Sequence, residues 1–336
     1  MTTAQTAMHY IDHGTGGPPE ALRLIEGPRP AHGAHDLLIE VHYAGVNRPD
    51  VLQRMGKYPP PADASPVLGL EVAGRVAAVG ASVDGWSVGE PVCALAPGGG
   101  YAEFCVVPAE HALPIPDGLA LREAACLPET FMTVWANVFM RARAQAGESI
   151  LIHGGASGIG SAAIQLARVF GLGPIYVTCG EARKQDYCRA LGASEAINYR
   201  EEDFAERIRA LTAGRGVDIV LDMVGAPYFQ KNLDCCAADG RIAQIAFQQG
   251  ARAELNLQGL MMKRLTWTGS TLRARSRAAK AEIAAELRAR VWPRFTENPD
   301  ALRPHIHAEF PLAAAAEAHR MMDAGEHLGK IVLRVR

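Results

Sequence analysis

Residues 149–171 read SILIHGGASGIGSAAIQLARVFG, a short apolar run followed at once by a turn of glycines and small residues and then by helical spacing. The free N–H groups at a helix start and the positive end of the helix dipole attract a phosphate. Small side chains in the turn let a bulky diphosphate approach the backbone. This stretch therefore predicts a nucleotide-binding strand–turn–helix unit, and it restricts the fold to one that contains such a unit.

The turn matches the dinucleotide fingerprint G-x-G-x-x-G with one departure. In the frame from Gly155 to Gly160, Ser157 stands where the middle glycine is expected, and its hydroxyl could donate to a phosphate instead of leaving room. An ordinary turn between a strand and a helix is the alternative reading. We expect every residue of the turn to bind the cofactor: Gly155, Ala156, Ser157, Gly158, Ile159 and Gly160.

Strand-like segments alternate with helical stretches from residue 149 onwards. They lie at 149–155, 174–180, 196–199, 217–225, 240–247 and 264–270. This alternation predicts an α/β domain, a doubly wound parallel sheet covered by helices. The first third of the chain reads instead as short strands broken by turns, which favours a barrel-like β domain. The part after residue 304 reads as strand, helix and strand, and we expect it to rejoin the N-terminal domain.

Composition narrows the class of protein further. A length of 336 residues suits two domains, and a formal net charge of −2 gives no general attraction to nucleic acid or anionic membranes. The 7 cysteines are odd in number and form no CxxC motif, so a reducing cytoplasm is expected. The N-terminus does not read as a signal peptide, and no apolar run approaches the roughly 18 residues of a membrane span.

Six segments in order resemble the zinc-free quinone oxidoreductases of the medium-chain dehydrogenase/reductase superfamily. They lie at 43–61, 68–76, 127–135, 153–167, 191–204 and 329–333. The block GVNRPDVLQRMGKYPPP is most similar to the p53-inducible-type NADPH quinone reductase branch. The resemblance implies a GroES-like β-barrel catalytic domain from residues 1–128 and 276–336 and a Rossmann NADP-binding domain from 129–275. It also implies a substrate cleft at their junction and a homodimer.

No metal is expected. Zinc alcohol dehydrogenases of the superfamily carry cysteine and histidine where this chain has Asn47 and Leu70, which cannot supply thiolate or imidazole ligands. Cys93 and Cys105 are isolated and do not form a tetrahedral set. Without a Lewis acid to polarise an alcohol, an easily reduced quinone or conjugated enone is the better substrate, and the cofactor carries the chemistry.

The second Rossmann strand indicates NADPH rather than NADH. Cys179 and Gly180 stand where an NAD enzyme places an acid for the ribose hydroxyls, and Arg183 and Lys184 suit a 2′-phosphate. Glu181 opposes this reading, because a carboxylate about 4 Å from a phosphate costs about 1 kcal/mol in water and about 4 kcal/mol at intermediate dielectric. We expect the two cations to outweigh it. The alternative is that these charges belong to a solvated helix start.

The resemblance and the positions after the later strands supply the other candidate residues. The catalytic candidates are Asn47, Tyr58 and Thr133. The further cofactor candidates are Tyr199, Phe247, Thr271, Leu272 and Lys330. Asn47 is expected to donate to a substrate carbonyl or to the nicotinamide ribose, and a purely structural role is the alternative for it and for Tyr58.

The sequence therefore predicts NADPH-dependent reduction of quinones, by transfer of a hydride or of one electron. An enoyl or enone reductase on the same fold is the nearest alternative, and a non-catalytic NADPH-binding structural or RNA-binding protein is a further one. The basic run 273–290 interleaves its cations with glutamates and alanines, so we interpret it as a solvated helix and expect no nucleic-acid partner. No membrane partner is expected.

Overall fold

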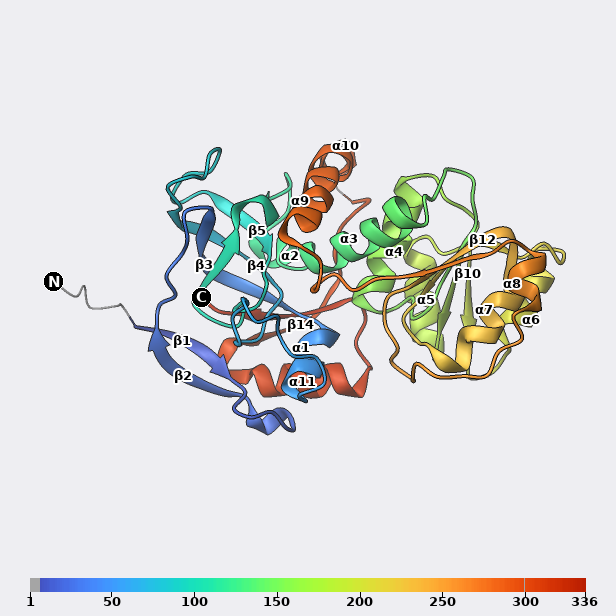
Figure 1. Cartoon of the computed structure of the whole chain (residues 1–336), viewed down its shortest axis with the longest axis horizontal. Coiled ribbons are helices and arrows are strands. Elements are labelled where there is room, and N and C mark those ends of the chain that lie inside the picture. The colour runs from blue at the N-terminus through green and yellow to red at the C-terminus, as the bar shows by residue number, and fades with distance from the viewer. Residues whose placement is uncertain (1–6, 299) are drawn as a thin grey trace. The chain divides into compact units, whose positions relative to one another are not determined.

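Both ends of the chain belong to one unit, and the residues between them form another (Figure 1). The computed structural model describes residues 7–298 and 300–336. The first unit comprises Met1–Met132 and Arg273–Arg336, and the second comprises Thr133–Leu272. The division falls inside helix α3 (Pro128–Val134), a few residues from the expected boundaries after 128 and before 276.

The first unit is built on a seven-stranded sheet in the order β14-β15-β3-β4-β5-β7, with β6 also paired to β3. Its strands are β3 (Asp36–Val46), β4 (Glu71–Val79), β5 (Pro91–Leu95), β6 (Phe104–Pro108), β7 (Ala112–Pro114), β14 (Ile306–Pro311) and β15 (Lys330–Arg334). β15 pairs antiparallel with β3, with Ile331 opposite Val46. The C-terminal strand therefore completes the N-terminal sheet, as the sequence predicts.

Smaller elements surround this sheet. A separate antiparallel hairpin joins β1 (Ala7–Asp12) and β2 (Arg23–Pro28), drawn in dark blue in Figure 1. The helices of the unit are α1 (Arg48–Arg54), α2 (Leu121–Ala124), α9 (Arg277–Glu286), α10 (Trp292–Glu297) and α11 (Ala315–Ala324). Short helical turns are η1 (Pro19–Ala21), η2 (Ala109–His111), η5 (Leu287–Val291) and η6 (Leu312–Ala314).

The basic run forms α9 and η5, so its helical conformation is as predicted, but one face is covered. Lys280 and Ile283 are buried, and the Lys280 ammonium donates to the Arg273 carbonyl at 2.8 Å. The long apolar stem of a lysine packs well against a core while its head group finds a polar partner. The charges on this helix therefore serve the unit's own packing as well as its solvation.

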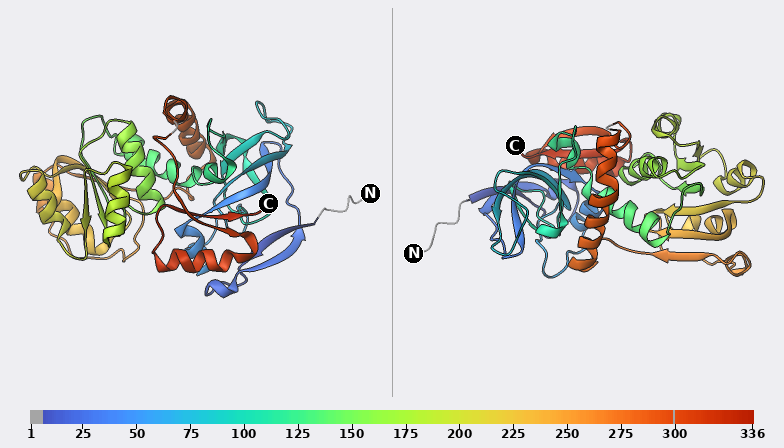
Figure 2. Two further views of the ribbon diagram at one scale, coloured as in Figure 1. Left: turned by 180° about the vertical axis from the view of Figure 1, so that it is seen from behind. Right: turned by 90° about the horizontal axis from the view of Figure 1, so that it is seen from above.

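The second unit is a six-stranded parallel sheet in the order β10-β9-β8-β11-β12-β13. Its strands are β8 (Ile150–Ile152), β9 (Ile175–Cys179), β10 (Glu195–Asn198), β11 (Val217–Asp222), β12 (Cys236–Gln244) and β13 (Thr266–Gly269). Its helical elements are η3 (Trp135–Arg141), α4 (Gly158–Val169), α5 (Ala182–Leu191), α6 (Phe204–Leu211), η4 (Ala226–Tyr228), α7 (Phe229–Cys235) and α8 (Gln258–Met262). Helices lie on both faces of the sheet (Figure 2), so the doubly wound prediction is confirmed.

Burial explains why these strands read as short continuous apolar runs. Ile150, Leu151 and Ile152 of β8 are all 0 % exposed, as expected for a parallel strand covered on both faces. β8 ends at Ile152 rather than at Gly155, because Gly154 turns the backbone with a φ of +66°. Among the described residues, no helix combines the length and apolar character that a bilayer crossing requires.

Candidate cofactor and substrate sites

The strand order of the second unit reverses between β8 and β11, and the carboxyl ends of parallel strands at such a reversal form the usual ligand edge. Every expected cofactor residue of this unit follows one of those ends. The turn 155–160 follows β8, Gly180, Arg183 and Lys184 follow β9, Tyr199 follows β10, Phe247 follows β12, and Thr271 and Leu272 follow β13. The fold therefore brings these residues to one edge of the sheet.

The glycines of the turn are required by close packing of the backbone. A Cβ at Gly155 would lie 2.7 Å from the Val177 Cβ and 3.0 Å from the Cys188 Sγ. A Cβ at Gly160 would run into the Gly154 carbonyl oxygen. Helix α4 can therefore approach β8 and β9 only because these positions lack side chains. The absence of side chains also leaves the backbone of the turn accessible to a diphosphate.

Ser157 is the N-cap of α4. Its Oγ accepts a hydrogen bond of 3.0 Å from the Gly160 N–H, and its hydroxyl donates weakly to the Met223 sulfur at 3.8 Å. The cap satisfies one of the N–H groups that a helix start leaves open. Because thioether sulfur is a weak acceptor, the hydroxyl can still turn to a phosphate. The donation predicted for Ser157 is compatible with this geometry and stays a prediction.

The loop after β10 closes over the end of β9. A Cβ at Gly180 would lie 2.8 Å from the Tyr199 hydroxyl oxygen and 3.1 Å from the Arg200 Nε. Tyr199 is 41 % exposed, so its ring remains open to a ligand. Arg200 was missed in the sequence, although it directly follows the third strand. It adds a cation at the place where the 2′-phosphate was expected.

Glu181 forms an ion pair with Lys184, with 2.9 Å between Oε1 and Nζ. The hydrogen bond and charge of Lys184 lower the pKa of Glu181, and Arg183 and Arg200 contribute in the same direction. From the sequence, Arg183 and Lys184 are expected to outweigh Glu181. In the structure three cations influence this carboxylate. The Glu181 side chain is 40 % exposed and that of Lys184 is 16 % exposed, so the ion pair is partly open to solvent, and a phosphate can compete for Lys184.

A buried polar cluster lies at one end of the sheet in the first unit. The Lys330 ammonium donates to Glu71 Oε1 at 2.6 Å, to Asn47 Oδ1 at 2.7 Å and to the Val46 carbonyl at 3.3 Å. Asn47 Nδ2 in turn donates to Glu71 Oε1 at 2.9 Å. Asn47 follows β3, while Glu71 and Lys330 begin β4 and β15, the two strands that flank β3. The sheet register therefore assembles the cluster.

This cluster gives Asn47 and Lys330 partners that the sequence did not predict. Burial by itself would lower the pKa of Lys330, but the charge of Glu71 and its hydrogen bond raise it above the ordinary value. Lys330 is therefore a charged ammonium whose three N–H groups all have acceptors. Its predicted contact with the cofactor would require one of these bonds to break, and it stays a prediction.

Tyr58 lies among charged groups of the same unit. The Arg273 guanidinium carbon is 5.7 Å from the centre of the Tyr58 ring, and its Nη1 donates to Gln53 at 2.7 Å. Burial and the charge of Glu129 raise the pKa of Tyr58, against the opposing effect of Arg273. The phenol is therefore a proton donor at neutral pH. Arg273 and Glu129 were not singled out for this role from the sequence.

Glu129 is partly exposed at the start of α3, and its backbone N–H donates to Glu71 Oε2 at 2.9 Å. Burial and the charges of Glu71 and Asp50 raise the pKa of Glu129 to about 8. Its carboxyl is therefore largely protonated at neutral pH. Thr133, the third catalytic candidate, lies in the same helix and is 9 % exposed.

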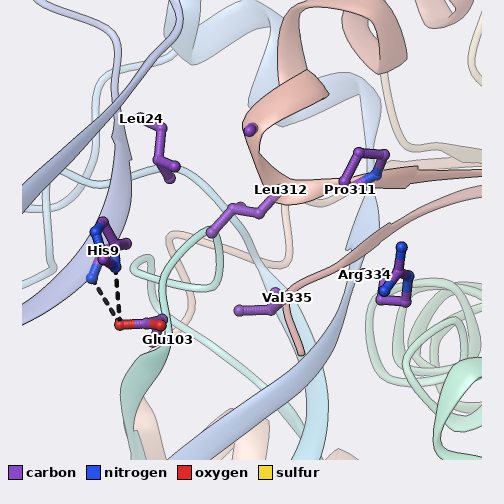
Figure 3. A pocket seen from close by; sticks show the side chains of 8 residues that line it. His9, Leu24, Glu103, Pro311, Leu312, Arg334 and Val335 are labelled. Atoms are coloured by element: carbon purple, nitrogen blue, oxygen red, sulfur yellow. Dashed lines mark hydrogen bonds and ion pairs between the residues drawn. The ribbon is translucent and has the colours of Figure 1, made fainter.

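Three cofactor candidates of the second unit differ in exposure. Phe247 is 53 % exposed with its ring centre 6.0 Å from that of Phe229, Thr271 is exposed, and Leu272 is buried. A pocket of about 240 Å³ in the first unit contains none of the expected site residues (Figure 3). It is lined by His9, Leu24, Glu103, Pro311, Leu312, Ala313, Arg334 and Val335.

Two family models match the chain. An alcohol dehydrogenase GroES-like domain matches residues 33–117, and a zinc-binding dehydrogenase matches residues 158–288. The residues of this chain do not fit zinc, because Asn47 and Leu70 replace its usual ligands and the Lys330 ammonium already contacts Glu71. Within residues 7–298 and 300–336, no three His, Cys, Asp or Glu side chains are grouped to hold a metal.

Similar proteins span the whole chain. A quinone oxidoreductase of Rattus norvegicus is 30% identical over 336 residues, covering 99% of both chains. A mycocerosic acid synthase-like polyketide synthase of Mycobacterium tuberculosis is 34% identical over 322 residues, which are 96% of this chain and 15% of that protein. A mycobacterial protein solved in complex with NADPH is 31% identical, with a TM-score of 0.86 over 98% of this chain and 100% of that one.

Proposed function

Because the chain belongs to the zinc-free quinone oxidoreductase family of the medium-chain dehydrogenase/reductase superfamily, we propose that it reduces quinones with NADPH. The observation that carries the proposal is the Lys330–Glu71–Asn47 cluster, in which Asn47, the residue that stands where a zinc-dependent relative carries a cysteine, is hydrogen-bonded to a buried ammonium. An ammonium cannot coordinate and polarise an alcohol. An acceptor that takes up reducing equivalents without a Lewis acid is therefore the fitting substrate.

The residues at the ligand edge of the second unit fit NADPH. When bound, NADPH supplies the hydride at its nicotinamide ring. The turn 155–160 would hold the diphosphate, and Tyr199 would pack near the adenosine. Arg183, Lys184 and Arg200 would bind the 2′-phosphate, and we propose a preference for NADPH over NADH on this ground.

On the substrate side, Tyr58 and Asn47 are the donors available to an acceptor oxygen. The Tyr58 hydroxyl keeps its proton at neutral pH. Asn47 uses Oδ1 for Lys330 and one amide hydrogen for Glu71. Its other hydrogen has only a long contact of 3.5 Å with the Gly45 carbonyl, so it is the group left for a substrate carbonyl. Thr133 is proposed to contact the cofactor ribose.

Reduction of a conjugated enone is the second candidate. The observation that favours it is the match of 96% of this chain to a segment of a polyketide synthase at 34% identity. The same donors would serve an enone oxygen. A non-catalytic protein would bind NADPH and oxidise it with neither class of acceptor.

We also propose a homodimer formed at the edge of the second unit's sheet. β13 is the terminal strand of that sheet, and an open strand edge can pair with another copy. On α8, Met261 is 69 % exposed and Met262 is 65 % exposed, an apolar surface of the kind that interfaces cover. Sedimentation of the wild type beside Met261→Glu/Met262→Glu tests this: a dimer that the charges split supports it, and a monomeric wild type contradicts it.

NADPH oxidation measured across a panel of ortho-quinones, para-quinones and enones tests the main proposal. Turnover with quinones supports it, and turnover with enones alone transfers the function to the second candidate. NADH serves as the control cofactor, and a preference for it would remove the phosphate role of the three cations. Asn47→Ala should slow turnover, and unchanged turnover would exclude Asn47 from the site.

A further inference from the structure

Two neighbouring cations of the first unit are buried without a carboxylate partner. Arg273 is 7 % exposed and Lys280 is 8 % exposed. The Lys280 ammonium donates to the Arg273 carbonyl at 2.8 Å, which places the two residues side by side. Among the described residues, no carboxylate lies at ion-pair distance from either head group. Because a buried charge is costly unless an opposite charge accompanies it, this Arg273–Lys280 pair is incomplete as it stands.

The other buried cations of the unit provide a contrast. Arg54 is 2 % exposed, and its Nη2 lies 3.0 Å from Asp323 Oδ2. Lys330 is 4 % exposed, and its Nζ lies 2.6 Å from Glu71 Oε1. The fold therefore supplies a carboxylate to each of these two cations and none to the Arg273–Lys280 pair, which leaves a local excess of positive charge where water is scarce.

The hydrogen bonds of the pair leave donors available. Arg273 Nε and Nη2 donate to the Pro97 carbonyl at 3.3 and 3.2 Å, and Nη1 donates to Gln53 Oε1 at 2.7 Å. The Gln53 amide is itself fixed, because its Nε2 donates to the Pro66 carbonyl at 2.8 Å. A guanidinium has five N–H donors and an ammonium has three. Within the part of the chain that the structure describes, two donors of Arg273 and two of Lys280 therefore have no acceptor.

The carboxylates at longer range do not neutralise the pair. Asp50 already accepts two backbone N–H groups, at 2.8 and 3.0 Å. Burial and neighbouring carboxylates raise the pKa of Glu129 to about 8, so Glu129 is largely uncharged at neutral pH. Asp63 is exposed to solvent, where its charge is screened. An anion from outside the chain would therefore meet a net positive site.

The pair adjoins a residue proposed for the substrate side. The guanidinium carbon of Arg273 is 5.7 Å from the centre of the Tyr58 ring. Tyr58 is partly exposed, and no described residue hydrogen-bonds to its hydroxyl. In the sequence, Arg273 directly follows Thr271 and Leu272, two of the expected cofactor residues. An acceptor whose oxygen meets the Tyr58 hydroxyl would therefore have a substituent within reach of a guanidinium whose orientation is already fixed.

We propose that the Arg273–Lys280 pair binds an anionic substituent of the acceptor, a carboxylate or a group of the same chemistry, so that the chain prefers acidic quinones or enones to neutral ones. A fixed guanidinium suits the two oxygens of a carboxylate, and the ammonium adds a second charge. The reacting oxygen stays with Tyr58 and Asn47. The identity of the substrate rests on the proposed function, whereas binding of an anion at this pair does not.

Binding of a probe that cannot be reduced tests the pair without any turnover. The full-length protein is saturated with NADP⁺, which occupies the cations of the second unit, and is titrated calorimetrically with naphthalene sulfonate. Naphthalene sulfonamide, a neutral compound of nearly the same shape, is the control. The Kd of the sulfonate should be about tenfold lower or more, the effect of one hydrogen bond to a charged group. Equal Kd values for the two compounds overturn the proposal.

Three variants assign the preference to the pair. Lys280→Gln and Arg273→Gln should each raise the Kd of the sulfonate about tenfold and leave that of the sulfonamide unchanged. Arg288→Gln is the matched control, because it removes the same charge from an exposed position of η5 and should change neither Kd. Equal losses in all three variants would indicate a general attraction by the charge of the unit and overturn the pair. The comparison of the two probes on the wild type does not depend on any variant folding.

Steady-state kinetics separates this proposal from the proposed function. NADPH oxidation is measured with naphthoquinone and with naphthoquinone sulfonate, and the ratio of their kcat/KM values is compared between wild type and Lys280→Gln. The ratio should shift about tenfold toward the neutral quinone in the variant. An unchanged ratio overturns the role of the pair and leaves the proposed function intact. Tight binding of naphthalene sulfonate by a protein that reduces no acceptor overturns the proposed function and leaves the anion site intact.

Discussion

Replacing Lys330 with methionine would remove a positive charge from a buried site, where water cannot solvate the carboxylate that is left behind. The side chain is 4 % exposed and its partner Glu71 is 0 % exposed. Methionine keeps much of the length of lysine and its apolar stem, so the change acts mainly on the charge. The Glu71 carboxylate would lose the contact of 2.6 Å to Nζ and remain buried.

The expected loss in the free energy of unfolding depends on the hydrogen bonds that Glu71 retains. Removing one partner of a buried ion pair costs about 3–5 kcal/mol, because the other charge is left uncompensated. Glu71 retains the Asn47 amide at 2.9 Å and the Glu129 backbone N–H at 2.9 Å. These two donors place the expected loss near the lower value, about 3 kcal/mol. For a unit of this size that loss lowers the melting temperature by about 6–12 °C.

Urea denaturation followed by tryptophan fluorescence measures the loss, since Trp86 and Trp292 belong to the first unit. The matched control is Lys330→Met/Glu71→Gln, which replaces the ion pair by neutral groups and should recover most of the stability. The reasoning is refuted if the free energy of unfolding of Lys330→Met lies within about 0.5 kcal/mol of the wild-type value, the range of ordinary surface substitutions. A double variant no more stable than the single one would show that the loss has another cause.

Three further predictions concern groups of both units. Glu129→Gln should gain stability over the wild type in urea as pH rises from about 5 to 8. The reason is that the pKa of Glu129 is raised from 4.5 to about 8 in the folded chain, so the unfolded chain ionises first and the wild type loses stability as pH rises. Parallel pH dependences of the two free energies of unfolding would contradict this. Gly160→Ala should destabilise the second unit by about 1–3 kcal/mol and weaken NADPH binding in calorimetry, because its Cβ would run into the Gly154 carbonyl. Arg200→Ala should weaken NADPH about tenfold and NADH little, whereas Arg209→Ala, an exposed control in α6, should change neither; equal losses for both cofactors would contradict the phosphate role.

The second unit could be read from the sequence because its signals are local. Each strand is a short apolar run, and the turn after β8 carries glycines whose need is visible in the residues themselves. The strand ends were less accurate: β11 ends at Asp222, whereas the apolar run was read to Gly225. The Asp222 Oδ1 accepts the Val224 N–H at 2.6 Å, so a side chain turns the backbone before the apolar residues end. This hydrogen bond joins residues only two positions apart, so the early end of the strand has a local cause that the apolar pattern did not reveal.

The polar cluster of the first unit could not be read in this way. Asn47 and Glu71 are 24 positions apart, and Asn47 and Lys330 are 283 positions apart. They meet because β4 and β15 both pair with β3, and the pairing of Ile331 with Val46 places Lys330 level with the end of β3, next to Asn47. The sequence identified Asn47 and Lys330 as candidates from family resemblance and passed over Glu71 beside Leu70. Register is a property of the assembled sheet, so no local pattern reveals it.

The way Lys330 is bound also limits what chemistry the first unit can support. An ammonium has three N–H donors, and those of Lys330 are used by Glu71, Asn47 and the Val46 carbonyl. It can neither accept a lone pair, as a metal ion does, nor offer a free donor to a substrate oxygen. Polarisation of a substrate then falls to neutral donors such as the Tyr58 hydroxyl, whose effect is weaker than that of a metal. Acceptors that are reduced with little polarisation fit such a site, which is why we propose quinones and enones as substrates rather than unactivated aldehydes.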